Sequence, residues 1–294
     1  MSKLSAEPRQ LVGGAARRER LRRSRLYLVT DDTTPSEDLP ELLAEAVRGG
    51  VDLVQLRRKG VPPEQLVALA ANCREVCHAA GALFLVDDHV ELAAAAGADG
   101  VHLGQEDTSV AEARSRLGPD FLIGLSTHDA AQVKSATSLD LDYIAAGPVH
   151  RTPTKMGTPA VGFEHVEAAA RAAAVPVVAI GGLSLADAGT AIAAGADIVA
   201  VVRAICASSD PEEAARALRG QVDTAPAWSW IELNGEARKC PPQATVQGLL
   251  AGLHLDPTGL VVERNGVIVD RQLWAEVAVG AGDTLELVHF VGGG

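Results

Sequence analysis

Two pairs of acidic residues follow two apolar runs that lie close together in the chain. Asp87 and Asp88 come directly after LFLV, and Glu106 and Asp107 follow GVHLGQ. The apolar runs are typical of buried strands, and the Ala-rich segment between them, which ends in Gly, is typical of a connecting helix. Parallel strands joined in this way end at the same edge of a sheet. We therefore expect Asp88 and Asp107 to lie one strand apart.

Two carboxylates in such a position are expected to hold a cation. At a separation of ~4 Å and an effective dielectric constant of about 20, two negative charges repel by about 4 kcal/mol. A shared proton or a bound cation relieves this repulsion. Hard divalent ions prefer oxygen ligands, so the sequence predicts a metal site at Asp88 and Asp107.

A basic stretch follows another apolar run, VDLV. Gln55, Arg57 and Lys59 alternate along the chain, so on a strand their side chains point to the same side. Polar side chains inside a packed barrel cost free energy unless they face a ligand. Their charge predicts an anionic ligand, and a solvated basic strand end is the alternative.

Two further stretches carry groups suited to phosphate. The loop GPVHRTPTKMGTP contains Thr152, Thr154 and Lys155, which can offer two hydroxyl groups and an ammonium group. Gly181 and Gly182 end a later apolar run just before a helical segment. At that place barrels bind substrate phosphates through backbone N–H groups and a helix dipole. We interpret both stretches as phosphate-binding.

Several other polar residues have weaker assignments. Ser126, at the end of FLIGLS, is a candidate hydrogen-bond donor to a substrate. His102 and His128 have no evident carboxylate or nucleophile partner in the sequence, so we interpret them as structural or site-lining. The cysteines lack partners at metal or redox spacing and are interpreted as core or surface residues: Cys73, Cys77, Cys206 and Cys240.

Eight apolar runs alternate with amphipathic or Ala-rich segments between residues 26 and 222, which predicts an α/β fold, a closed (β/α)₈ TIM barrel. A repeated Gly-x-Asp motif stands at the start of three of the predicted strands. Gly is favoured at the end of the preceding helix, and Asp is favoured in the tight turn into the strand. It occurs as Gly50-Val51-Asp52, Gly97-Ala98-Asp99 and Gly195-Ala196-Asp197. The predicted strands are 26–30, 51–57, 83–88, 99–105, 121–127, 142–149, 175–182 and 197–205.

The pattern changes after the barrel. Residues 223–229 are predicted to be a linker, and residues 230–294 contain two Asn-Gly pairs, at Asn234 and Asn265, around one short helical segment. Asn-Gly pairs are typical of tight hairpins. We predict a small α+β domain with a β-grasp (ubiquitin-like) fold, followed by an extended tail of three glycines that ends at Gly294.

Composition limits the classes of function. The chain has 294 residues, 47% of them hydrophobic, and its formal net charge of −12 argues against a nucleic-acid surface. The basic segment 1–25 is a local exception without the apolar core of a signal peptide. No window reaches the ~18 uninterrupted apolar residues of a membrane span. We expect a soluble, cytoplasmic protein with no membrane or nucleic-acid partner.

Residues 26–222 resemble the thiamine-phosphate synthase family. The motifs occur in the order of that family: QLRRK at 55–59, DD at 87–88, GVHLGQED at 100–107, GLST at 124–127, TPTK at 152–155 and AIGG at 179–182. Residues 230–294 resemble the sulfur-carrier protein ThiS through WIELNGE, the RNG turn and the ending VHFVGGG. Together the two resemblances cover nearly all of the chain after its first 25 residues.

The first resemblance implies a reaction in which 4-amino-5-hydroxymethyl-2-methylpyrimidine diphosphate joins a thiazole phosphate, or its carboxylate, with release of pyrophosphate. Asp88 and Asp107 would hold Mg²⁺, and the groups acting in catalysis would be Arg57, Lys59, Ser126 and Lys155. The implied substrate-binding residues are Gln55, Leu56, Arg57, Arg58, Lys59, Asp87, Ser126, Thr152, Pro153, Thr154, Lys155, Gly182, Val202 and Arg203.

Within that set the resemblance implies different duties. Arg57, Lys59 and Lys155 would neutralise the diphosphate, Gln55 and Ser126 would orient it, and the thiazole phosphate would be bound by Thr152, Thr154 and Gly182. Two positions depart from the family pattern. Asp87 stands where an Asn usually contacts the diphosphate, and Arg203 stands where a Ser usually helps to bind the thiazole phosphate.

The second resemblance implies that the carboxylate of Gly294 is activated as an acyl-adenylate and converted to a thiocarboxylate for thiazole formation. The implied partners are a ThiF-like adenylyltransferase, a sulfur donor and thiazole synthase. Three alternatives remain open. The barrel could be a thiazole tautomerase, it could serve only as a partner of the Gly-tailed carrier, or the carrier could be of the molybdopterin type.

Overall fold

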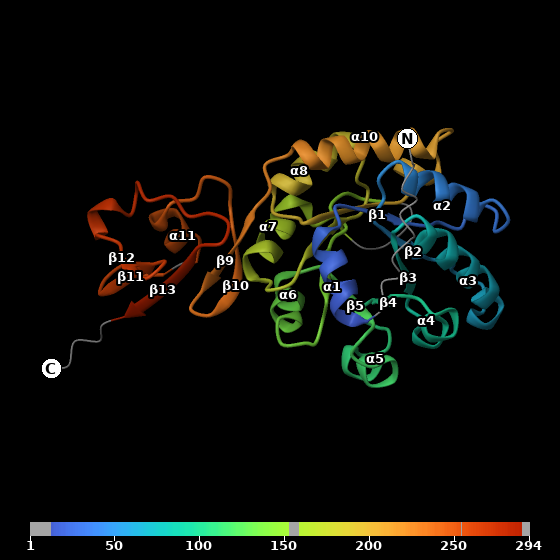
Figure 1. The fold of residues 1–294 in the computed structure, drawn as a ribbon, viewed down its shortest axis with the longest axis horizontal. Coiled ribbons are helices and arrows are strands. Elements are labelled where there is room, and N and C mark those ends of the chain that lie inside the picture. Colours follow the sequence, from blue (N-terminus) through green and yellow to red (C-terminus); the bar gives the residue numbers. More distant parts are fainter. Residues whose placement is uncertain (1–12, 153–158, 254, 290–294) are drawn as a thin grey trace, which may run out of the picture.

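The computed structural model describes residues 13–152, 159–253 and 255–289. The N-terminal domain is a closed barrel of eight parallel strands in the order β1 to β8. This confirms the predicted TIM barrel (Figure 1). Each observed strand lies within its predicted range. The strands are β1 (Leu26–Val29), β2 (Leu53–Leu56), β3 (Leu83–Asp87), β4 (Gly100–Leu103), β5 (Leu122–Thr127), β6 (Tyr143–Ala146), β7 (Val177–Ile180) and β8 (Ile198–Val201).

Helices surround the barrel and bury its outer face. Alternate strand residues point outward to pack against the helices or inward to the barrel interior, where Leu53, Leu85 and Leu122 are fully buried. The helices are α2 (Leu39–Arg48), α3 (Pro63–Ala79), α4 (Val90–Ala96), α5 (Val110–Leu117), α6 (Ala130–Ala136), α7 (Gly162–Ala172), α8 (Leu185–Ala193), α9 (Arg203–Cys206) and α10 (Pro211–Thr224).

The end of the eighth strand differs from the prediction. Residues 197–205 were expected to be one strand, but β8 stops at Val201 and Arg203–Cys206 form the short helix α9. Val202 has φ −118° and ψ −84°, which breaks the extended conformation. Arg203 therefore begins a helix and does not lie on a strand.

The basic N-terminal segment forms helix α1 (Gly14–Arg23), which contacts β3 and β5. Leu21 of α1 is fully buried and belongs to the apolar cluster inside the barrel. The helix thereby covers the end of the barrel where the strands begin. This explains a basic segment in a chain whose net charge is −12.

Four buried aspartates surround that end of the barrel, one before each even-numbered strand. Each carboxylate accepts a backbone N–H of a neighbouring strand or its flank, at 2.8 to 2.9 Å, from Arg25, Phe84, Ile123 or Val177. The Gly-x-Asp motif in the sequence contains three of these aspartates, but it predicted only a turn at each of them. The four residues, which we call the aspartate ring, are Asp52, Asp99, Asp142 and Asp197.

Helix α1 supplies cations to three members of the ring. Arg17 Nε lies 2.9 Å from Asp99 and Arg18 Nε 2.6 Å from Asp142. Arg20 Nη2 lies 3.2 Å from Asp52. Buried carboxylates need such partners, because an unpaired buried charge is costly. The fourth member, Asp197, is paired from the other end of the chain.

The C-terminal domain is a mixed five-stranded sheet in the order β10-β9-β13-β11-β12 with one α-helix, which confirms the predicted β-grasp fold. Both Asn-Gly pairs form hairpin turns with positive φ, at 49° for Asn234 and 53° for Asn265. The elements are β9 (Ser229–Leu233), β10 (Glu236–Cys240), α11 (Val246–Gly252), β11 (Leu260–Arg264), β12 (Val267–Ile268), the 3-10 helix η2 (Arg271–Leu273) and β13 (Thr284–His289).

The two domains meet where β10 contacts α7, as Figure 1 shows. Lys239 of β10 donates hydrogen bonds to the carboxylate of Asp197 and to the carbonyl oxygen of Gly195. Trp228, between α10 and β9, donates from Nε1 to the carbonyl oxygen of Ala193 at 3.0 Å, and Arg171 lies over its ring. The small domain thus completes the aspartate ring.

Two further observations concern helix length and the cysteines. The described chain contains no helix with the length and apolar character needed to cross a bilayer. All four cysteines are free thiols, three of them buried. Burial raises the pKa of Cys73 and of Cys206 to about 12, and that of Cys240 to about 11. Thiols of this kind are inert packing residues.

Candidate active site

A cavity of about 800 Å³ opens at the end of the barrel opposite the aspartate ring, where the strands finish. Its lining includes most of the residues that the sequence indicated, together with His102 and His128, which the sequence analysis interpreted as structural or site-lining. The indicated residues that line it are Gln55, Arg57, Lys59, Asp87, Asp88, Asp107, Ser126, Thr152, Gly182, Val202 and Arg203.

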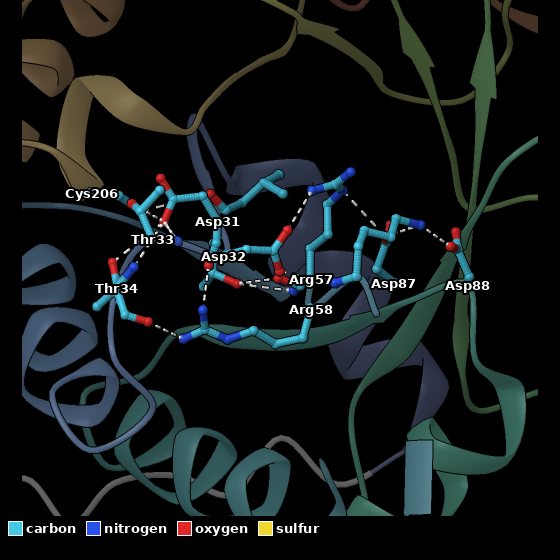
Figure 2. A network of polar contacts seen from close by, with 12 residues as sticks. Asp31, Asp32, Thr33, Thr34, Arg57, Arg58, Asp87, Asp88 and Cys206 are labelled. Atoms are coloured by element: carbon cyan, nitrogen blue, oxygen red, sulfur yellow. Dashed lines mark hydrogen bonds and ion pairs between the residues drawn. The ribbon is translucent and has the colours of Figure 1, made fainter. Parts of the chain in front are cut away.

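An acidic and basic rim forms one side of the cavity. The ammonium group of Lys59 contacts the carboxylates of both Asp87, at 3.2 Å, and Asp88. Arg57 Nε lies 3.5 Å from Asp87, and its Nη1 lies 3.8 Å from Asp32 (Figure 2). Cationic and carboxylate side chains therefore alternate around the rim. The cationic side chains can bind an anionic ligand, and the carboxylates can bind a divalent cation.

The carboxylates of Asp88 and Asp107 lie close to each other, as expected for ends of neighbouring parallel strands. Burial, a hydrogen bond with Asp88 and repulsion by Asp88 raise the pKa of Asp107, while the backbone N–H of Gly104, 2.7 Å from Oδ2, opposes the shift. Asp88 has a φ of 60°, an uncommon conformation for a residue other than Gly. The backbone is thus constrained where two negative charges approach.

This pair suits Mg²⁺, which proteins hold through one or two carboxylates while substrate phosphates and water complete the shell. Burial and the neighbouring Asp88 both disfavour a charged Asp107 and raise its pKa, and a cation between the two carboxylates would favour their ionised forms. Among the described residues no cluster of three or more His, Cys, Asp and Glu side chains is arranged around a common metal position. The remaining ligands of an ion at Asp88 and Asp107 would therefore come from the substrate and water.

Charge and burial compete at Asp87 and Lys59. Burial raises the pKa of Asp87, opposed by the nearby Lys59 and Arg57. Burial disfavours the charge of Lys59, but hydrogen bonds and attraction from Asp88 and Asp87 raise its pKa. Lys59 therefore stays protonated and forms ion pairs with both carboxylates. It can bind an anionic ligand that replaces one of these carboxylates as its partner.

Two residues of the QLRRK motif do not line the cavity. Leu56 is 2% exposed and packs in the apolar layer between strands and helices. Arg58 is 8% exposed and donates to the carbonyl oxygens of Asp31, at 2.6 Å, and Thr34, at 2.7 Å. Figure 2 shows Arg58 turned toward the loop after β1. Its position differs from that of a substrate-binding residue because alternate side chains of a strand point to opposite faces.

The opposite side of the cavity is suited to phosphate. Gly181 and Gly182 have φ values of 101° and 69°, and an added Cβ would lie 2.4 Å from Pro148 or 2.8 Å from His150. Only glycine fits this close approach to the loop after β6. Thr152 and Arg203 line the same side of the cavity. The predicted substrate residues Pro153, Thr154 and Lys155 lie outside the described residues.

The loop after β6 is held by a short polar chain. His150 Nε2 lies 3.1 Å from Asp187, which also accepts from the backbone N–H of Ser184 at 2.9 Å. Hydrogen bonds from Ser184 and His150 lower the pKa of Asp187 although burial opposes them. Helix α8 and the loop after β6 are thereby joined beside the glycine pair.

Sequence reasoning missed Arg151, which lines the cavity, and three residues that contact its lining. Asp32 follows β1 as Asp88 follows β3, so the acidic end of LYLVTDD carried the same signal. Arg151 lines the cavity from the predicted loop. Tyr27 and Tyr143 contact site residues from inside the barrel, through hydrogen bonds to Gln55 and His102. No local pattern distinguishes them from ordinary core tyrosines.

Comparisons with known proteins agree with this geometry. Residues 26–205 match the family model described as thiamine monophosphate synthase, and residues 231–294 match the model of the ThiS family. A thiamine-phosphate synthase of Gloeobacter violaceus is 46% identical over 198 residues, covering 67% of this chain and 57% of its own. That of Acidothermus cellulolyticus is 45% identical over 194 residues, 65% of this chain and 92% of its own.

The chain spans 57%, 56% and 59% of the lengths of relatives from Gloeobacter violaceus, a Nostoc species and Nostoc punctiforme.

Among solved structures, thiamine phosphate pyrophosphorylase from Pyrococcus furiosus superposes with a TM-score of 0.63 and 32% identity, covering 69% of this chain and 98% of its own. A 3-hexulose-6-phosphate synthase, with 19% identity and a TM-score of 0.54, shares the fold alone.

Proposed function

The chain belongs to the thiamine monophosphate synthase family, and from this premise we propose that its barrel joins 4-amino-5-hydroxymethyl-2-methylpyrimidine diphosphate to a thiazole phosphate or its carboxylate. The C–O bond between the pyrimidine methylene and the diphosphate breaks, and pyrophosphate leaves with the electron pair. The thiazole nitrogen then forms a C–N bond to the methylene carbon. The products are thiamine phosphate and pyrophosphate.

One observation carries the proposal. A single cavity brings the paired carboxylates Asp88 and Asp107, the cations Arg57 and Lys59, and the glycine pair Gly181–Gly182 to one end of the barrel. Cationic side chains and a divalent ion can bind a diphosphate, and the backbone N–H groups of a tight turn before a helix can bind a second phosphate. The arrangement offers separate places for two phosphorylated substrates.

The side chains act mainly on the leaving group. Pyrophosphate carries high charge, so stabilising that charge lowers the barrier more than a protein nucleophile would. Mg²⁺ held at Asp88 and Asp107 would supply a further positive charge to the diphosphate. Arg57 and Lys59 would bind its oxygens, and Lys155 of the loop after β6 would add a third cation. Gln55, Asp87 and Ser126 would orient the pyrimidine substrate.

The other substrate would lie across the cavity. Its phosphate would be bound by the backbone of Gly182 and by hydroxyl groups of Thr152 and Thr154. Val202 and Arg203 would contact it from the end of β8, where the cavity lining includes both. A guanidinium at position 203 can bind phosphate more strongly than the hydroxyl usual in the family, because its hydrogen bonds are charge-assisted.

For the C-terminal domain we propose a sulfur-carrier role, supported by the match of residues 231–294 to ThiS. A ThiF-like adenylyltransferase would use ATP to convert the carboxylate of Gly294 to an acyl-adenylate with release of pyrophosphate. A sulfur donor would then displace AMP and leave a thiocarboxylate, which thiazole synthase would use. We propose a cytoplasmic location, where these partners and small phosphorylated substrates would meet the protein.

The test is pyrophosphate release from the two substrates, each omitted in turn, with and without Mg²⁺. Release that needs both substrates and Mg²⁺ supports the synthase. A thiazole tautomerase would act on the thiazole alone without Mg²⁺, and a barrel that serves only as a partner of the carrier would release no pyrophosphate. The Thr127→Val variant is a suitable control, because the Thr127 hydroxyl donates to Ala145 O and does not line the cavity.

A further inference from the structure

Lys59 lines the candidate active site, although it lies beyond the end of a strand. β2 stops at Leu56, and its pairing with β1 and β3 ends at Gln55 and Leu56, so the sheet does not fix the backbone of Lys59. The side chain of Lys59 is 49% exposed and is not held by packing alone. Its position in the cavity therefore depends on contacts of its own short segment with another part of the chain.

The loop after β1, residues 30–34, provides these contacts. Thr30 still belongs to the sheet, since its N–H group donates to the carbonyl oxygen of a β2 residue at 3.0 Å. Its buried hydroxyl group accepts from the backbone N–H of Arg57 at 2.9 Å and donates to the carbonyl oxygen of the same residue at 3.2 Å. Further along, Oδ1 of Asp32 accepts from the backbone N–H of Lys59 at 2.9 Å. The sheet thus holds Arg57 through Thr30, and the loop holds Lys59 through Asp32.

The side chain of Arg58 binds the same loop. Its guanidinium group donates from Nη1 to the carbonyl oxygen of Asp31 at 2.6 Å and from Nη2 to that of Thr34 at 2.7 Å, as Figure 2 shows. The carboxylate of Asp31 closes the turn between these two carbonyl groups, because it accepts from the backbone N–H groups of Thr33, at 3.0 Å, and Thr34, at 3.3 Å. The guanidinium group therefore spans a turn that contains Asp32.

Burial makes this use of Arg58 costly. The residue is 8% exposed, the acceptors of its two terminal nitrogens are neutral carbonyl oxygens, and its Nε has no hydrogen-bond partner in the described part of the chain. An apolar side chain would pack at this place without the desolvation of a cation. A lysine would not make the same contacts, because one ammonium group lacks the planar fork that reaches two separate carbonyl oxygens. Packing therefore does not account for Arg58, whereas its double contact with the loop does.

Two roles of Asp32 differ in strength. Its Oδ2 lies 3.8 Å from Nη1 of Arg57, and its side chain is 46% exposed, so this ion pair is long, solvated and weak. The hydrogen bond from the N–H group of Lys59 is shorter and is strengthened by the charge of the carboxylate. Asp32 therefore acts mainly as an acceptor for the backbone of Lys59, a role that an asparagine can fill without a charge.

We propose that Arg58 and Asp32 are positioning residues that hold the backbone of Lys59 against the loop after β1 and thereby keep its ammonium group in place for the diphosphate. Neither of the two residues lines the cavity, so both act through Lys59. Their effect on the backbone is a property of the free protein. Their effect on the diphosphate rests on the proposed function.

The direct test is amide hydrogen exchange in the full-length protein without ligand, followed by NMR. Arg58→Met removes a group that makes no hydrogen bond to the N–H of Lys59, yet this N–H should exchange at least about tenfold faster, because the turn that carries Asp32 is released. The N–H of Arg57, held through Thr30, should change much less. An unchanged exchange rate at Lys59 in folded Arg58→Met overturns the proposal.

Asp32 offers a second pair of variants on a half-exposed side chain, which decide the question if Arg58→Met does not fold. Asp32→Ala should speed the exchange of the Lys59 N–H, and Asp32→Asn, which keeps an acceptor oxygen, should not. An Asn variant that exchanges as fast as the Ala variant would mean that charge and not the hydrogen bond matters, and would overturn the proposal. The control is Arg74→Met, which removes a guanidinium group that donates to the carbonyl oxygen of Ala96, away from the loop.

The pyrophosphate assay tests the consequence for catalysis. Asp32→Ala and Arg58→Met should each lower kcat/KM for the pyrimidine diphosphate by about tenfold, the effect of one lost charge-assisted hydrogen bond, and should leave KM for the thiazole phosphate within about twofold. Asp32→Asn should retain most of the activity, and Arg58→Lys should not. Equal losses toward both substrates would indicate general damage to the barrel and would overturn the positioning role.

A double variant shows whether the effect passes through Lys59. Once Lys59→Ala has removed the ammonium group, adding Asp32→Ala should lower kcat/KM no further, because residues that act through one group are not additive. A further tenfold loss would overturn the proposal. If the protein releases no pyrophosphate from any substrate combination, the exchange rates at Lys59 still decide whether Arg58 and Asp32 hold its backbone. Failure of the two proposals can therefore be told apart.

Discussion

Nζ of Lys239 in the small domain lies 2.9 Å from Oδ2 of Asp197 at the start of the barrel strand β8. The side chain of Lys239 is 1% exposed, so this ion pair between the domains is shielded from water. Burial lowers the pKa of Lys239, and attraction to Asp197 opposes that shift. The C-terminal domain is therefore attached to the end of the barrel that lies opposite the candidate active site.

Removing one partner of this pair should cost far more than replacing both partners. Asp197→Asn leaves a buried ammonium without its counter-charge and should lower the free energy of unfolding by about 3–5 kcal/mol. Lys239→Met leaves the buried carboxylate of Asp197 without its counter-charge and should cost a similar amount, whereas the double variant Asp197→Asn/Lys239→Met leaves no unpaired charge and should cost less than either single variant. Urea unfolding followed by tryptophan fluorescence measures both, because Trp228, Trp230 and Trp274 all lie in the last third of the chain.

The control for this pair is Arg238→Met, which changes a neighbouring side chain of β10 whose partner is the exposed Glu236. It should leave the unfolding curve nearly unchanged. A double variant that loses as much as the sum of the two single variants would contradict the role of Lys239 as the partner of a buried carboxylate.

Helix α1 should stabilise the barrel through its arginines. Arg18→Ala removes the 2.6 Å contact with Asp142 and a hydrogen bond to the carbonyl oxygen of Pro119. We expect a loss of about 1–3 kcal/mol, typical of hydrogen bonds to charged groups. Arg22→Ala, on the exposed face of the same helix, is the matched control. Thermal unfolding should separate the two variants, and equal midpoints would show that α1 is not held through the aspartate ring.

The carboxylate pair should make the metal-free protein sensitive to pH. Because burial and Asp88 raise the pKa of Asp107 in the folded protein, the folded state binds more protons than the unfolded state above about pH 3.8, the usual pKa of Asp. Stability should therefore fall as the pH rises through the raised pKa. Asp107→Asn, which resembles the protonated form, should unfold at a higher temperature than the wild type at pH 7 without metal.

Mg²⁺ should reverse that order. An ion that binds only the folded state raises the unfolding temperature of the wild type, whereas Asp107→Asn should respond little and should release no pyrophosphate. Asp88→Ala should also abolish turnover while the fold remains. Glu64→Gln, an exposed carboxylate of α3, is the stability control. Near wild-type turnover of either aspartate variant in millimolar Mg²⁺ would exclude the metal assignment.

Gly294 should gain sulfur when the carrier pathway is complete. After incubation with an adenylyltransferase, ATP and a sulfur donor, the C-terminal peptide should gain about 16 Da, the exchange of one oxygen for sulfur. The gain should vanish when Gly294 is deleted, while pyrophosphate release by the barrel continues. An unchanged mass with a demonstrably active adenylyltransferase would leave the small domain without a carrier role.

Local rules of the chain predicted the architecture. Eight apolar runs separated by amphipathic segments were sufficient for a parallel barrel, because only short-range periodicity decides which face of each element is buried. Asn234 and Asn265 predicted two hairpins because an Asn-Gly pair adopts positive φ at low cost. Alternation along residues 55–59 also predicted that Gln55, Arg57 and Lys59 share a face, and all three line the cavity although β2 ends at Leu56.

At Arg58 the alternation of side chains predicted the structure better than the family resemblance did. It treated QLRRK as a block of substrate contacts, but Arg58, which follows the end of β2, turns away from the cavity and binds the loop after β1. The period of two along a strand assigns neighbouring residues to opposite environments whatever their charge. The loop residues Pro153, Thr154 and Lys155 stay predictions.

By itself the sequence determined the elements, their order and the strand ends that carry charge, since each depends on residues close together in the chain. Only the tertiary structure decided which charges and hydroxyls meet. Arg18 contacts Asp142 across 124 positions, Lys239 contacts Asp197 across 42, and Tyr27 contacts Tyr143 across 116. Closure of the barrel and docking of the second domain bring these groups together, and no local periodicity records a contact between elements so far apart.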